Sequence, residues 1–414
     1  MLSKKLRLFL TLPIIMSLIL TVCAGSVAAS DVPAVRIGIL LPLTGADALD
    51  GQNQRNAHEF AAQEINALGG IAALGGAKIE LVWGDTQGRV ELGNAETERL
   101  IVNEDVIAVM GAFHSGVTLS AVRIAEQYQV PFINPAALSV EITRQGMQYT
   151  FQTMLTTFGL CRIQGEVILY LNEKFGTEVR TVGIIRNDGF IGNQMILGWQ
   201  EYLPKQGFDI VVDAVFPPAA TNVQSAVLSL MAANPDVVVS QANAQEALLV
   251  IRTLKEMDWW PKYGVVTAGA GYSNPDVLNS LGELAEGLVL VSDWFPEINR
   301  PGSQEVNSRF REQFGTDMLG AANTAYASTW VVKEALEIAG AADRQKLFEV
   351  LRNLRLTGGR IGFMYDFVSF CDIGLNEGAQ GVAAQVIDGR VLTVWPEEVR
   401  VAEPVWPVPH WNNR

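Results

Sequence analysis

The sequence predicts an α/β protein of two lobes, each built on an open and mainly parallel sheet. Strand-like and helix-like segments alternate along the chain, a pattern typical of βαβ units. The alternation runs through one set of units and then starts again near residue 161. The chain has 414 residues, and a length of this order favours two domains over one.

The first set of units begins with a β-branched apolar run at residues 35–41, which ends at Pro42 and predicts a buried strand. Apolar residues at helical spacing follow, from Ala57 to Leu68, and Gly69-Gly70 closes that helix. The pattern continues with strands expected at 78–83, 106–110 and 131–133, and helices at 52–67, 91–102 and 119–127.

The second set repeats this order. Helices are expected at 161–175, 193–202, 223–233 and 244–257, and strands at 179–185, 209–215, 237–239 and 263–267. Three more helices are expected at 303–314, 321–339 and 344–354. Near the end, Asp388-Gly389 stands between two apolar runs and predicts a β-hairpin.

The first 30 residues have the layout of a secretory signal peptide. Three basic residues precede an apolar run at 8–22, and small residues follow up to Ser30. The run is short for a membrane span, which needs about 20 residues. Two processing routes stay open: cleavage after Val27-Ala28-Ala29, or lipidation of Cys23 in a lipobox-like Leu20-Thr21-Val22-Cys23. Either route predicts a periplasmic or extracellular protein, with Cys23 as its one potential membrane anchor.

Charge excludes two classes of partner. The whole chain carries −14, from 30 basic and 44 acidic residues, and loss of three basic residues with the leader leaves −17. Such a balance argues against nucleic acid and against anionic membrane surfaces. Beyond Cys23, the cysteines are Cys161 and Cys371, and the sequence leaves open whether they pair.

No motif indicates catalysis. The sequence lacks a dinucleotide-binding glycine pattern, a P-loop, a zinc-protease motif and a nucleophile elbow. Its three His residues form no metal-binding pattern. His114 could line a ligand cleft, although a lone histidine is more often structural. We therefore expect no catalytic residue, metal or cofactor.

Five stretches resemble the leucine/isoleucine/valine-binding proteins, the type I periplasmic binding proteins of branched-chain amino acid ABC transporters. The resemblance extends from about residue 35 to about residue 394. The five stretches are Pro42-Leu43-Thr44-Gly45 with Gly51, residues 62–71 with Gly84-Asp85, residues 110–115, residues 130–137 and, at an expected passage between lobes, Leu284-Ala285-Glu286-Gly287.

This resemblance implies two Rossmann-like lobes hinged by three crossovers, with a small polar ligand held between them. Lobe one would be residues 31–153 plus 291–357, and lobe two residues 154–290 plus 358–414. The expected role is the extracytoplasmic solute-binding component of an ABC importer, with permease subunits as partners. The alternative is a ligand-sensing module of a receptor or regulator with the same fold.

In lobe one, the expected ligand contacts follow two strands. Ser115 stands where a strand gives way to a helix, where a serine either caps the helix or binds a ligand carboxylate. Gly116 allows close approach of the backbone. Ala136, Leu138 and Ser139 belong to the second loop that cups the ligand in the family. Leu138 stands where amino-acid binders carry a hydroxyl, and Ser139 replaces that hydroxyl if the alignment slips by one residue.

In lobe two, the expected contacts are Phe190, Asn243, Gly269 and Tyr272, with Trp294 near the hinge. The resemblance assigns the aromatic contact to Phe190 or to the adjacent Ile191. Gly269 stands where amino-acid binders carry an acid for the ligand ammonium, and no Asp or Glu follows before Asp276. A buried ammonium without an acidic partner is unfavourable. A small carboxylate, an amide or a urea-like solute is therefore expected to suit the site at least as well as an α-amino acid.

Overall fold

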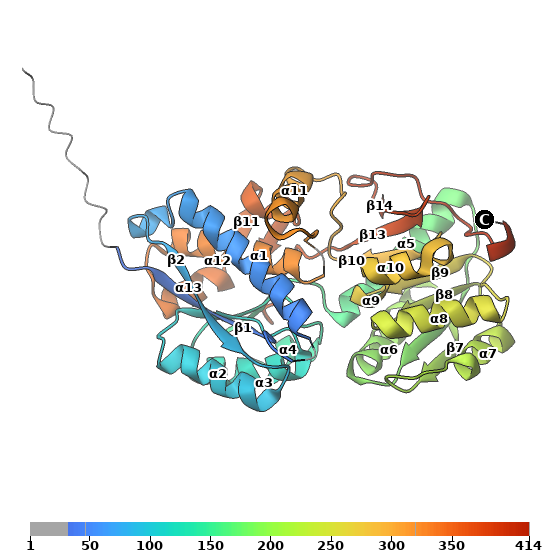
Figure 1. Ribbon diagram of the computed structural model, residues 1–414, viewed down its shortest axis with the longest axis horizontal. Coiled ribbons are helices and arrows are strands. Elements are labelled where there is room, and N and C mark those ends of the chain that lie inside the picture. Colours follow the sequence, from blue (N-terminus) through green and yellow to red (C-terminus); the bar gives the residue numbers. More distant parts are fainter. Residues whose placement is uncertain (1–31, 46, 319, 414) are drawn as a thin grey trace, which may run out of the picture.

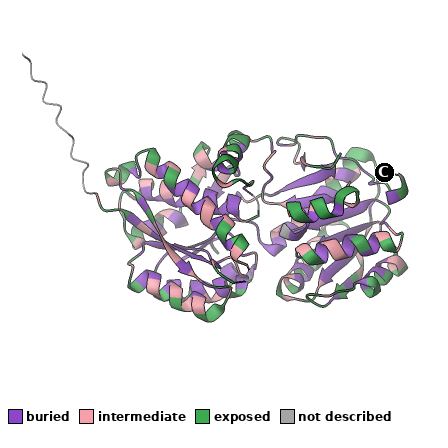
Figure 2. Cartoon of the chain, in the orientation of Figure 1, coloured by how far each residue is buried: buried purple, intermediate pink, exposed green. Residues whose placement is uncertain are grey.

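The protein consists of two sheets covered by helices, and the expected fold class is confirmed (Figure 1). The computed structural model describes residues 32–45, 47–318 and 320–413. The central strands are mostly buried, whereas the outer faces of the helices and parts of the edge strands are exposed (Figure 2). The expected signal peptide and Cys23 lie outside the described residues. Within the described ranges, no helix has the length and apolar character needed to cross a membrane.

The first sheet has five parallel strands in the order β2-β1-β3-β4-β5. Parallel strands are joined by long crossover connections, usually helices, and α1, α2 and α3 supply them here. The strands are β1 (Val35–Leu41), β2 (Ile79–Asp85), β3 (Ala108–Met110), β4 (Phe132–Asn134) and β5 (Thr150–Gln152), and the helices are α1 (Ala48–Ala67), α2 (Val90–Val102), α3 (Ser115–Gln127) and α4 (Glu141–Arg144).

Alternation along β1 explains how the helices divide between the two faces of this sheet. Ile37 and Ile39 pack in the cluster that contains Phe60 of α1. Leu40 points the other way and packs in the cluster that contains Leu100 of α2 and helix α3. Because both faces are buried, every β1 residue except Arg36 is buried, as a parallel sheet requires.

The second sheet has seven strands in the order β14-β13-β10-β9-β8-β6-β7, of which β6 to β10 are parallel. The predicted hairpin is present as β13 and β14, which add an antiparallel edge. The strands are β6 (Thr181–Asn187), β7 (Asp209–Phe216), β8 (Val237–Gln241), β9 (Gly264–Ala268), β10 (Val289–Ser292), β13 (Val382–Ile387) and β14 (Arg390–Trp395).

Helices α5 and α6 contact each other, and α7, α8 and α10 form a second contacting group on this lobe. Their bounds are α5 (Thr157–Phe175), α6 (Phe190–Tyr202), α7 (Gln224–Ala233), α8 (Ala244–Glu256), α9 (Ala270–Ser273) and α10 (Pro275–Leu281). The later helices return to the first lobe, where α12 packs along α1 (Figure 1). They are α11 (Ser303–Phe314), α12 (Ala322–Ala339) and α13 (Arg344–Arg352).

The chain passes between the two sheets three times. It leaves the first sheet after β5, returns after β10, and leaves again before β13. The stretch at residues 284–287, where a passage was expected, instead leads into β10 in the middle of the second sheet. The passage follows at Asp293, directly after the end of β10. The first three residues of β10 are buried within the second sheet, and Ser292 is half-buried.

Residues 358–378, expected in lobe two, pack on the first lobe instead. Strand β12 (Phe367–Ser369) pairs with β11 (Arg355–Thr357), and Leu375 bridges Gln152 at the end of β5. Phe370 packs edge-on against Phe151, with 5.1 Å between ring centroids. These apolar and main-chain contacts attach the separate two-stranded sheet of β11 and β12 to the first lobe, so the third passage lies near residue 379.

Cys161 and Cys371 are both free thiols. Cys161 is buried, and its thiol donates to the carbonyl of Met195 at 3.3 Å. Burial raises the pKa of this thiol well above its usual value, which suppresses the reactive thiolate. Cys371 is half-buried near the edge of the first sheet.

The two thiols should therefore differ in reactivity. We expect a maleimide reagent to label Cys371 in the native protein, and Cys161 only after unfolding without a reductant, because only unfolding exposes it. Mass spectrometry of the labelled peptides distinguishes the two. A peptide pair joined through Cys161 and Cys371 under non-reducing conditions would contradict the structure.

Candidate ligand-binding site

A cavity of about 550 Å³ lies between the two sheets, at the carboxyl ends of strands from both. This is the edge at which open α/β sheets bind ligands, and the volume suits a small molecule. Strands β3 and β4 contribute from one side, and β8, β9 and β10 from the other. The lining residues with expected roles are Ser115, Gly116, Ala136, Leu138, Phe190, Asn243 and Gly269.

On the first-lobe side, α3 begins at Ser115 and directs its first turn at the cavity. The Ser115 hydroxyl accepts a hydrogen bond from the backbone N–H of Ser139 at 3.3 Å, which leaves its own proton to donate. Gly116 is exposed, and a Cβ built there would meet nothing within 4 Å. The N-terminus of a helix favours an anionic group, so this wall suits a carboxylate.

The loop after β4 places Ala136 and Leu138 on the cavity. The Leu138 carbonyl accepts from the N–H of Thr157, which ties the loop to the start of α5. Ser139 does not lie on the cavity, and its expected role as a replacement hydroxyl is wrong. It is completely buried, and its hydroxyl accepts from the N–H of Glu141 at 3.3 Å. The register of the loop therefore presents an apolar side chain where a hydroxyl was sought.

On the second-lobe side, Phe190 and Ile191 both line the cavity, at the start of α6. Asn243 lines it as well, although its side chain already caps α8: Oδ1 accepts from the N–H of Glu246 at 3.0 Å. The amide NH₂ of Asn243 therefore remains available to donate to a ligand. Gly269 and Gly271 complete this wall. A Cβ at Gly271 would lie 2.1 Å from the Ala242 carbonyl, so only glycine fits there.

Tyr272 and Trp294, expected as an aromatic wall, point elsewhere. Tyr272 is buried, and its hydroxyl bonds that of Ser240 at 2.7 Å. The Trp294 indole N–H donates to Ser303 at 2.6 Å, and its ring packs edge-on against Phe363. A buried Trp or Tyr needs a partner for its polar atom, and both partners lie in the protein core. These two side chains stabilise the lobes rather than line the cavity.

Asp293 lines the cavity and was missed in the sequence. It follows β10, and its carboxylate accepts from the backbone N–H of Leu155 at 2.8 Å. Burial raises the pKa of Asp293 to about 6, and the N–H groups of Leu155 and Asp293 itself oppose that shift only in part. The available signal was the apolar run at residues 288–291, which predicts a strand and is followed two residues later by an acid.

Several other lining residues were also missed. Gln241 ends β8, and its Oε1 is buried without a hydrogen-bond partner among the described residues. His114, by contrast, was named in the sequence as a residue that could line the cleft; it lies on the cavity, and its Nε2 is 3.1 Å from Asp47. The remaining lining residues are Phe113, Met154, Leu160, Ala242, Ser273, Val291, Ser292, Gly320, Ala321 and Thr324. Residues 320–324 precede or begin α12, a segment that is remote in sequence and carried no recognisable signal.

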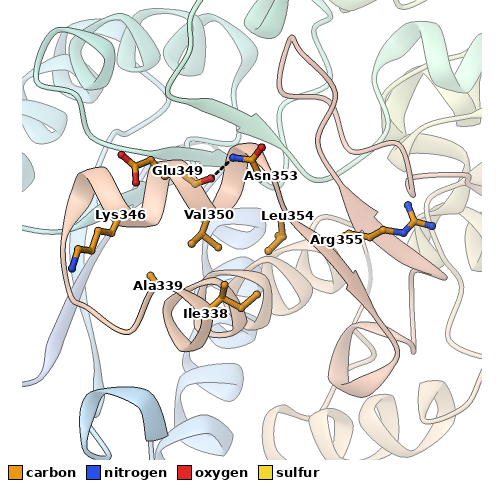
Figure 3. A pocket seen from close by; sticks show the side chains of 8 residues that line it. All are labelled: Ile338, Ala339, Lys346, Glu349, Val350, Asn353, Leu354 and Arg355. Carbon is orange, nitrogen blue, oxygen red and sulfur yellow. Dashed lines mark hydrogen bonds between the residues drawn. The ribbon is translucent and has the colours of Figure 1, made fainter.

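A second hollow of about 600 Å³ lies on the first lobe, between α12 and α13 (Figure 3). Its floor is aliphatic, from Ile338, Val350 and Leu354. Lys346, Glu349 and Arg355 stand at its rim, and the Asn353 amide donates to the Glu349 carbonyl at 2.9 Å. No strand ends there, so this hollow lacks the main-chain groups that the interlobe cavity offers. Among the described residues, no group of His, Cys, Asp and Glu is suited to hold a metal ion.

The raised pKa of Asp293 implies that the free energy of unfolding depends on pH. The folded protein holds this proton up to a pH of about 6, whereas the unfolded chain releases it near 3.8. The free energy of unfolding therefore falls as the pH rises between these values, and the deficit persists above them. We expect Asp293→Asn, which keeps the acceptor for Leu155, to match the ligand-free parent at a pH of about 4. At a pH of about 7.5 it should be more stable by about 1–3 kcal/mol.

Urea unfolding at both pH values measures this difference, with the exposed Asp209→Asn as the control. Two other titratable groups lie nearby, His114 on the cavity and the buried hydroxyl of Tyr365. Burial raises the pKa of Tyr365 well above its usual value, and the Asp293 carboxylate adds to that shift. An Asp293→Asn difference that is the same at both pH values would show that Asp293 titrates normally.

Comparison with known proteins agrees with this geometry. A family model described as periplasmic binding protein matches residues 34–370. A Leu/Ile/Val-binding protein homolog 7 from Brucella abortus is 27% identical over 395 residues, covering 93% of this chain and 97% of the relative.

Two solved structures share the fold. A branched-chain amino acid substrate-binding protein from Streptococcus pneumoniae, in complex with isoleucine, is 22% identical with a TM-score of 0.70, covering 90% of this chain and 100% of the other. A solute-binding protein of an ABC transporter from R. palustris, in complex with benzoate, is 19% identical with a TM-score of 0.70, covering 90% and 97%. Since the family model spans the chain from β1 into β12, the protein belongs to the periplasmic binding protein family, a family of binding proteins rather than enzymes.

Proposed function

We propose that this protein is the solute-binding component of an ABC importer and captures a small polar molecule in the interlobe cavity. The cavity itself is the observation that carries the proposal, because its walls come from strand ends of both sheets. The relatives support the ligand class, since one is in complex with isoleucine and another with benzoate. An amino acid or a small carboxylate is therefore the proposed ligand.

Ligand binding would act on the relative position of the lobes. A molecule that touches Ser115 on one side and Asn243 on the other has more contacts when the lobes are close, and so favours the closed arrangement. The backbone would move mainly at the three passages, near residues 153–156, 293 and 379. The closed form is the one proposed to dock on the permease subunits.

The lobes and the location are part of the same proposal. Lobe one would comprise residues 31–153 together with residues 293–378. Lobe two would comprise the rest of the mature chain. The leader at residues 1–30 would direct the protein to the periplasm or the cell exterior. Cleavage before Ser30 or Asp31 would free it, whereas acylation of Cys23 would anchor it, and the mass of the mature N-terminal peptide distinguishes these two forms.

A thermal-shift screen tests the function. The purified protein is first freed of bound ligand by unfolding and refolding, and then heated with amino acids, aliphatic and aromatic carboxylates, amides or urea. A ligand well above its Kd raises the melting temperature by mass action. We expect a rise with at least one amino acid or small carboxylate. If no member of either class shifts the transition, solute capture of this kind is refuted.

The role of Ser115 is tested with the ligand found in that screen. We expect Ser115→Ala to weaken binding by about 1–3 kcal/mol, because a ligand carboxylate would lose a hydroxyl donor in a buried site. Ser120→Ala, one turn or more along the same helix, is the matched control. Titration calorimetry measures both, and equal affinities in the two variants would remove Ser115 from the binding site.

A further inference from the structure

Asp293 is fixed at the junction of two passages between the lobes. It is the first residue after β10, and its Oδ1 accepts from Leu155, which lies in the passage between β5 and α5. The main chain therefore sets the position of the carboxylate, and its side chain lies on the cavity wall. An acid held in this way keeps its orientation while the lobes move around it.

This carboxylate has no cationic partner in the part of the chain that the structure describes. Among the described residues, no cation contributes to the pKa of Asp293, and the lining of the cavity contains no Lys or Arg. The one histidine of the lining, His114, faces Asp47. The Asp293 side chain is half-buried, and partial burial of a carboxylate without a counter-charge is the cause of its raised pKa.

The two walls of the cavity therefore favour ligand groups of opposite charge. The N-terminus of α3, with Ser115 and the open space above Gly116, attracts negative charge from the first lobe. Asp293 attracts positive charge from the edge of the second sheet. Between them the walls are largely apolar, with Leu138, Met154 and Leu160 among the lining residues.

We propose that the ligand of this cavity carries a protonated amine that pairs with Asp293, opposite a carboxylate held at Ser115 and Gly116. The inference rests on the proposed function and narrows its ligand class to amine-bearing carboxylates. It also replaces the expectation drawn from Gly269, because the acid that is absent from the loop after β9 is supplied by the end of β10. Asp293 is thus the residue that separates amino acids from plain carboxylates.

The test uses ligand pairs that differ only in the amine: L-leucine with 4-methylpentanoate, and L-phenylalanine with 3-phenylpropanoate. Calorimetry at a pH of about 7.5 measures each with the refolded parent, Asp293→Asn and the control Asp209→Asn. Asp209 begins β7 and is exposed at the strand end opposite the cavity. We expect the amine-bearing member of a pair to bind the parent more tightly and to lose about 30-fold or more in Asp293→Asn, with no change in the control.

Proton linkage at a pH of about 6 gives a second readout. An ammonium favours the ionised carboxylate, so its binding should release up to about half a proton per ligand. Calorimetry in buffers of different ionisation enthalpy measures that release. The proton release should disappear in Asp293→Asn. Because this variant retains His114 and Tyr365, any release that persists in it comes from those groups and not from Asp293.

The outcomes separate the two proposals. Tighter binding of the plain carboxylates, with proton uptake at a pH of about 6, would mean that a protonated Asp293 donates to an anion. That result would overturn the amine inference and leave solute binding intact. Amine-bearing ligands that bind the parent and Asp293→Asn equally would also overturn it. If the thermal-shift screen finds a carboxylate, amide or urea ligand but no amine-bearing one, the amine inference is overturned and solute binding stands.

Discussion

Parallel pairing is the constraint on which the rest of this molecule depends. In a parallel sheet all carboxyl ends lie along one edge, and the loops that follow them share that edge. Here the chain passes three times between two such sheets, so two of these edges face one cavity. Residues as distant in sequence as Ser115, Asn243 and Asp293 meet because each follows a strand of this kind.

The same arrangement decides which side chains belong to the core and which to the ligand. Trp294 and Tyr272 stand within a few residues of the cavity, yet their polar atoms are bonded to Ser303 and Ser240. Their neighbours Asp293 and Gly271 reach the cavity instead. At both positions a single step along the chain separates a residue that stabilises a lobe from one that a ligand can touch.

Asp293 shows how a binding site departs from the rules that govern a core. Its carboxylate accepts from the main-chain N–H of Leu155, and no basic side chain on the cavity wall offsets its charge. Such a group, when ionised, lowers the stability of the empty protein, and either protonation or a cationic partner from outside relieves this cost. Local strain or unpaired charge of this sort is expected where function, and not stability, has selected the residue.

The sequence by itself determined the alternation of strands and helices, most of their bounds, and the positions at which loops follow strands. These follow from periodicity, which is local: α11 begins at Ser303 and the hairpin turns at Asp388-Gly389, as expected. Of the ten ligand contacts expected from the sequence, seven line the cavity.

The tertiary structure decided the rest. The register of the loop after β4 buries Ser139, the packing of residues 358–378 moves the third passage, and the fold of the second sheet brings an acid from β10 to the place left by Gly269. Each of these depends on contacts between segments far apart in the chain, which no local pattern records.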